Sequence, residues 1–229
     1  MTPQTSSSFD AITSSNPKGA KAWWQGLGIT ALVLALLGYL LARLIMLPFL
    51  LGLFFYLIAG MIAGALAFRR ARHARPVRGR TILFGCVFVA LWATVCINFY
   101  EHEYIIQTIG AEPRFAEARN EAMSEGRPSQ EVTSQAGDAF RARLRRDFSP
   151  GGMIGYDRWM MAGGKMNLSV GSFTEPVSVQ HGGLLWPIRT AIGAMLIAIG
   201  LWFSFEALRR PTPVSNILQP GEPFESLDD

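Results

Sequence analysis

Four apolar runs, each long enough to cross a bilayer, constrain the fold of this chain more than any other feature. A helix of about 20 apolar residues spans the roughly 30 Å hydrocarbon core, because it satisfies its own backbone hydrogen bonds. The runs predict transmembrane helices at about 23–43, 47–68, 81–100 and 185–208. Only 17% of the residues are charged, against roughly 25% in soluble domains. The sequence therefore predicts an all-α membrane protein, and the lipid bilayer is one of its expected partners.

The orientation follows from the loop at residues 69–80, which holds six arginines and no acidic residue. Short loops rich in Lys and Arg stay in the cytoplasm, so this basic loop is predicted to be cytoplasmic. Four helices then leave both termini cytoplasmic, as a disordered tail at 1–22 and a second tail at 209–229. We expect a multi-pass protein of the cell membrane.

The segment 101–184 is then extracytoplasmic and is inserted between the third and fourth membrane helices. Its first part predicts a helical hairpin, with helices at 112–125 and 129–148 joined by Gly126-Arg127-Pro128. The second helix is amphipathic, since apolar residues recur along it at a spacing of four.

A Gly-rich lobe is predicted at 149–183, after the helical hairpin. Apolar and polar residues alternate at 166–170 and 177–179, which favours a short β-hairpin. Its core is expected to be thin. Large apolar residues such as Trp159 and Met160 are therefore expected to pack onto the bundle, the membrane interface or another protein.

The stretch Phe99-Tyr100-Glu101-His102-Glu103-Tyr104 places two carboxylates and an imidazole together at the end of the third run. On a helix, consecutive side chains point about 100° apart, so these three cannot converge on one ion. His181 lies before the fourth run and on the same predicted side as His102. His102 and His181 are thus the candidate metal ligands.

An alternative role for the two carboxylates is to neutralise arginines at the outer interface. Arg43 ends the first run and Arg189 begins the fourth, both on the side reached by Glu101 and Glu103. Charged side chains at this depth pair with one another or reach toward water. We expect ion pairs of about 4 Å or less between these carboxylates and Arg189, and also Arg43.

Small residues recur at a spacing of four within the predicted membrane helices, most clearly Gly60 and Gly64. Such pairs let two helix backbones approach closely. The Gly60 and Gly64 face is therefore expected to pack against another helix of the bundle, or alternatively to dock a partner subunit.

These features favour a non-catalytic accessory or assembly subunit of a larger membrane complex, without a cofactor. The expected contacts with other membrane subunits are the 60–64 face and the 149–183 lobe. Two alternatives remain: an outer-face metal or redox protein using His102 and His181, and a small sensor or transporter acting as an oligomer. Nucleic acid is not an expected partner, because no binding motif accompanies the basic loop.

Overall fold

Four long helices form a bundle in the computed structural model, which describes residues 17–43, 49–179 and 182–210. They are α1 (Pro17–Arg43), α2 (Phe49–Ala71), α3 (Gly79–Thr108) and α7 (Leu185–Phe205). All four are long and apolar enough to cross a membrane, which indicates a helical multi-pass membrane protein. The connection between α2 and α3, which we call the arginine-loop end, contains the short helix η3 (Arg72–Ala74).

The bundle packs through small and aliphatic side chains. α1 contacts α2 and α3, and α7 contacts the same two helices from its own side. Leu34, Ala63, Ala67 and Ile197 are fully buried where the helices meet. Large side chains such as Phe84 instead remain exposed on the outside of the bundle, as expected of a surface that faces lipid.

The helices differ in length from the predicted ones. α1 starts at Pro17, six residues before the predicted start, and α2 extends to Ala71 instead of residue 68. The largest difference is in α3, which was predicted to end near Tyr100 and continues to Thr108, followed by η4 (Ile109–Ala111). Ile105 and Ile106 explain the extension, because both are buried against the segment that follows.

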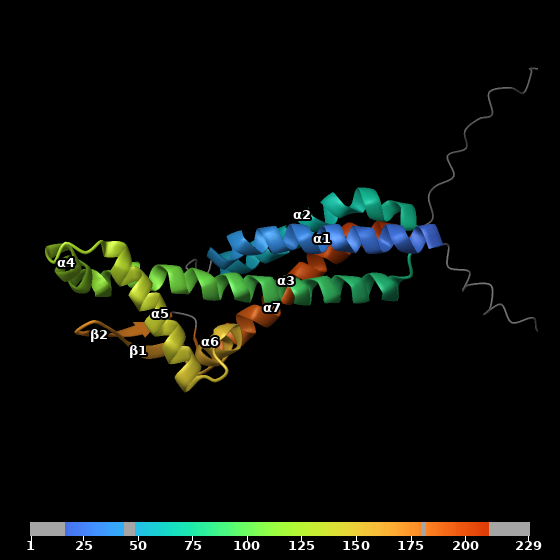
Figure 1. Ribbon diagram of the computed structural model, residues 1–229. Helices are drawn as coiled ribbons and strands as arrows, with labels where there is room; N and C mark the ends of the chain where they lie inside the picture. The colour runs from blue at the N-terminus through green and yellow to red at the C-terminus, as the bar shows by residue number, and fades with distance from the viewer. Residues whose placement is uncertain (1–16, 44–48, 180–181, 211–229) are drawn as a thin grey trace, which may run out of the picture.

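That segment, residues 109–179, folds as a lobe at the end of the bundle opposite the arginine-loop end (Figure 1). It contains η5 (Pro113–Phe115), α4 (Ala116–Ser124), α5 (Ser129–Asp147), α6 (Gly152–Met161), β1 (Lys165–Val170) and β2 (Phe173–Ser178). The strands form a two-stranded antiparallel sheet in which Lys165 lies opposite Ser178. The lobe thus has the two helices and the β-hairpin expected from the sequence, and adds α6.

Trp159 and Met160 were expected to pack against residues outside the 149–183 segment, and they do so in a core shared with α5 and the end of α3. Tyr156, Trp159 and Met160 of α6 are fully buried. The ring of Trp159 packs edge-on against Phe140 of α5, with 5.0 Å between centroids. The end of α3 completes this core through Ile106, so one helix serves both the bundle and the lobe.

Candidate functional site

Buried polar side chains gather where α3 leaves the bundle and meets α6 and α7. We call this cluster the joint and define it as Glu101, His102, Tyr156, Trp186 and Arg189. All five side chains are buried, in contrast to the arginines of the lobe surface. Burial of polar groups is costly unless they find partners, so the contacts within the joint decide what it can do.

Glu101 and Arg189 form a buried ion pair at the centre of the joint. The Nη2 of Arg189 donates a hydrogen bond to Oε1 of Glu101. Glu101 is 0% exposed and Arg189 is 7% exposed. The phenols of Tyr56 and Tyr156 lie within electrostatic range of both charges. Because a lone charge here would be strongly unfavourable, the pair ties α3 to α7 only while both partners are present.

The other two charged residues expected at this level have different partners. Glu103 lies 3.3 Å from Nδ1 of His102. The guanidinium of Arg43 lies over the ring of Tyr39, 4.4 Å from its centroid, and 5.8 Å from the centroid of Tyr104. Arg43 makes no ion pair with a carboxylate in the described part of the chain. Its charge is held instead against aromatic faces, which attract cations.

His102 packs edge-on against Tyr156, with 5.6 Å between ring centroids. Its Nε2 is buried and has no hydrogen-bond partner among the described residues. His181, the other candidate ligand, lies outside the described residues. Within residues 17–43, 49–179 and 182–210, no group of three or more His, Cys, Asp or Glu side chains is placed to hold a metal ion. The described residues thus provide His102 as one nitrogen ligand, with Glu103 beside it.

The Gly60 and Gly64 face packs against α7 of the same chain. A Cβ added to Gly60 would lie 2.5 Å from the carbonyl oxygen of Ile197, and one added to Gly64 would lie 2.5 Å from Cβ of Ser204. Gly200 meets this face from α7, since its Cβ would lie 2.6 Å from the carbonyl oxygen of Leu57. α7 therefore covers the face for which the sequence predicted either a contact within the bundle or a contact with a partner subunit.

Tyr156 and Trp186 belong to the joint although sequence reasoning did not assign them to a site. Tyr156 lies in a Gly-rich stretch for which the sequence predicts no helix, and Trp186 lies at the start of the fourth apolar run, for which it predicts only a membrane helix. One signal was available: Ile105, Ile106 and Ile109 continue the apolar face of α3 past Glu101. Apolar residues at this spacing favour a longer helix, which would have moved Glu101 from a helix end to a helix interior.

Asp157 of α6 is the neighbour of Tyr156 in the joint, and the shift of its pKa predicts a measurable change of stability with pH. Burial raises its pKa from 3.8 to about 6, and its Oδ1 has no hydrogen-bond partner in the described part of the chain. The fold therefore favours the protonated carboxyl group. The contribution of Asp157 to stability is fully present below pH 3.8 and is lost as the pH rises through about 6.

Asp157→Asn should remove this pH dependence. We expect the variant to be more stable than the unmodified protein at pH 7.5, where Asp157 is ionised, and equally stable near pH 4. The measurement is thermal unfolding in detergent across this range, followed by tryptophan fluorescence. A difference between the two proteins that stays constant with pH would contradict the assignment.

No family model, curated protein or solved structure matches this chain. Its class therefore rests on the architecture, which is that of a helical multi-pass membrane protein with a lobe at one end.

Proposed function

We propose that this protein is a non-catalytic accessory or assembly subunit of a larger membrane complex, with the lobe outside the cell membrane. Both termini and the arginine-loop end are then cytoplasmic. The six arginines at residues 69–80 support this orientation, because short basic loops are retained on the cytoplasmic side. The lobe is long enough to be translocated to the outer side of the membrane whatever its charge.

The observation that carries the proposal is the joint. α3 runs without interruption from the bundle into the lobe core, and the Glu101 and Arg189 pair fixes α3 to α7 at the level where the lobe begins. The lobe is thus presented in one orientation at the membrane surface. Such a rigid connection between the bundle and the lobe suits a protein that presents a binding surface to a neighbouring subunit.

With the Gly60 and Gly64 face covered by α7, the 149–183 segment and the adjoining Leu184 supply the surface for that partner. Ile154 and Met161 are each about half exposed, two turns apart on α6, and Leu184 is 82% exposed. Gly183 donates its N–H to the carbonyl of Met160 at 2.7 Å, which holds Leu184 beside the end of α6. We call these three residues the α6 patch. Its apolar character and its place next to α7 favour another membrane protein as the partner.

Photo-crosslinking in the native membrane tests this proposal directly. A photoreactive amino acid at Ile154 or Met161 should give a crosslinked protein adduct, which mass spectrometry then identifies. The matched control is the same amino acid at Ser172, which is exposed at the turn between β1 and β2 and should not give that adduct. Adducts with lipid alone from the α6 patch, or equal adducts from Ser172, would contradict the proposed interface.

A second candidate function, an outer-face metal or redox protein, is favoured by one observation: the buried Nε2 of His102 has no hydrogen-bond partner among the residues that the structure describes. This function needs further ligands, and His181 was the expected one. Metal analysis and a visible spectrum of the purified protein separate the two candidates. Stoichiometric metal that is lost in His102→Gln would favour the second candidate over the accessory subunit.

A further inference from the structure

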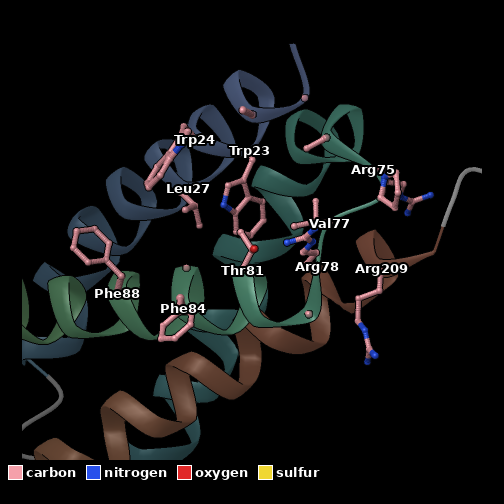
Figure 2. A pocket seen from close by; sticks show the side chains of 16 residues that line it. Trp23, Trp24, Leu27, Arg75, Val77, Arg78, Thr81, Phe84, Phe88 and Arg209 are labelled. Atoms are coloured by element: carbon pink, nitrogen blue, oxygen red, sulfur yellow. The ribbon is translucent and has the colours of Figure 1, made fainter. Parts of the chain in front are cut away.

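A cavity of about 1300 Å³ opens at the arginine-loop end, between the first turns of α1 and the first turns of α3 (Figure 2). It lies at the far end of the bundle from the joint and has no role in the function proposed above. Its lining comes from α1, the α2–α3 connection, α3 and the end of the described chain. Figure 2 shows Trp24, Phe84 and Phe88 toward one end of the cavity and Arg75, Arg78 and Arg209 toward the other.

The aromatic end of the cavity is built from membrane-facing side chains. Trp24, Phe84 and Phe88 are each at least 66% exposed and project from the spans of α1 and α3. The floor between them is closed, since a Cβ added to Gly85 would lie 2.7 Å from the indole of Trp23. This end is therefore an apolar groove that is continuous with the hydrocarbon region of a bilayer.

The basic end of the cavity carries positive charge from Arg75, Arg78 and Arg209. The guanidinium of Arg75 lies 5.2 Å from the ring centroid of Phe68, and its Nε is buried without a hydrogen-bond partner among the described residues. Neither Arg75 nor Arg209 forms an ion pair with a carboxylate in the described part of the chain. The sequence holds no acidic residue between Asp10 and Glu101, so α1, α2 and α3 offer none near this end.

The start of α3 adds to the positive potential. Arg78 occupies the N-cap position of α3 without a side-chain capping bond, and Ile82 makes the first backbone bond, to the carbonyl of Arg78. The backbone N–H groups at 79–81 precede that bond, and such N-terminal groups favour anions. Gly79 and Thr81 line the cavity, so this helix end and the arginines act on the same space.

We propose that this cavity binds one anionic diacyl phospholipid, with its phosphate at Arg75 and Arg209 and its acyl chains along Trp24, Phe84 and Phe88. A basic pocket between membrane helices is the arrangement expected for anionic lipid headgroups. In the orientation proposed above, this end faces the cytoplasmic leaflet, where anionic lipids concentrate. The volume exceeds the roughly 300–1,000 Å³ of ordinary small-molecule sites. A lipid therefore fits better than a free anion, which would leave the apolar end unfilled.

The test is native mass spectrometry of the full chain in detergent, with phosphatidylglycerol and phosphatidylcholine of matched acyl chains. The protein should retain one phosphatidylglycerol in preference to phosphatidylcholine. Arg75→Gln combined with Arg209→Gln should weaken that retention on the order of 30-fold, since each arginine near a phosphate contributes about fivefold. Phe84→Ala combined with Phe88→Ala should weaken the retention of both lipids.

Arg72→Gln combined with Arg80→Gln is the matched control, because it removes the same charge from exposed residues that do not line the cavity. This variant should retain phosphatidylglycerol. Equal loss in the control would mean that the lipid is held by the overall positive charge of this end and not by the cavity, and it would overturn the site. Three other results would also overturn the site: equal retention of phosphatidylcholine, displacement of the lipid by inorganic phosphate, or retention that Arg75→Gln combined with Arg209→Gln does not change. The last result is the one expected if the acidic 211–229 tail, and not a lipid, fills the cavity.

Discussion

Glu101→Leu should lower the free energy of unfolding by about 3–5 kcal/mol, because Arg189 would remain as an uncompensated buried charge. Glu101 is 0% exposed and holds the guanidinium by a direct hydrogen bond, so water cannot readily replace it. Arg189→Met should cost a similar amount by leaving the carboxylate alone. The measurement is denaturant unfolding of the purified protein in mixed micelles.

The double variant, Glu101→Leu with Arg189→Met, should recover most of that loss. Replacing a whole buried ion pair by apolar side chains of similar volume is often neutral or stabilising. The matched control is Glu103→Leu, which removes a carboxylate two residues away that is 35% exposed and makes no ion pair with an arginine that the structure describes. Its effect should stay below about 1 kcal/mol. Additive losses in the double variant would show that the two charges do not depend on one another.

Gly60→Ala should destabilise the contact between α2 and α7 by about 1–3 kcal/mol, the usual effect of overfilling a packed interface. The new Cβ would lie 2.5 Å from a backbone oxygen of α7, and a backbone atom cannot move aside as a side-chain tip can. Gly200→Ala should act in the same way from the α7 side, at 2.6 Å from the carbonyl oxygen of Leu57. Thermal unfolding of each variant in detergent checks both.

Gly52→Ala is the control for these two variants. Gly52 also lies in α2, yet an added Cβ there would meet no atom of the described residues within 4 Å. Alanine favours a helix over glycine by up to about 1 kcal/mol, so this variant should be as stable as the parent or more so. If Gly60→Ala behaved like Gly52→Ala, close packing of α2 and α7 would not be the reason for the glycine.

The membrane helices could be predicted from the sequence because length and hydropathy alone define them. The lobe could be predicted only in part, and α6 is the instructive failure. Its glycines suggested a loop, whereas Gly151 and Gly163, with φ values of 80° and 113°, lie just outside the helix. Gly155 lies inside α6, and a larger residue would not fit there, because its Cβ would come within 2.7 Å of the carbonyl oxygen of Phe148. Glycine can mean close packing as well as flexibility, and composition does not distinguish the two.

The joint could be predicted only as a set of residues on one side of the membrane. Side and depth placed Glu101 and Glu103 near Arg43 and Arg189, but they did not decide which side chains would meet. That choice depends on rotation about the helix axis, which brings Glu101 toward α7 and turns Glu103 outward beside His102. Glu101 and Arg189 are 88 residues apart, so no local pattern reports their contact.

The unbroken course of α3 from the bundle into the lobe has a mechanical consequence. Each residue added to or removed from an α-helix turns everything beyond it by about 100° and shifts it by 1.5 Å. Ile105 and Ile106 face the lobe core only because of their helical phase relative to Glu101. The direction in which the lobe faces is therefore set by a residue count along α3, and a single deletion between Glu101 and Ile105 would aim the lobe elsewhere while leaving every residue of the bundle unchanged.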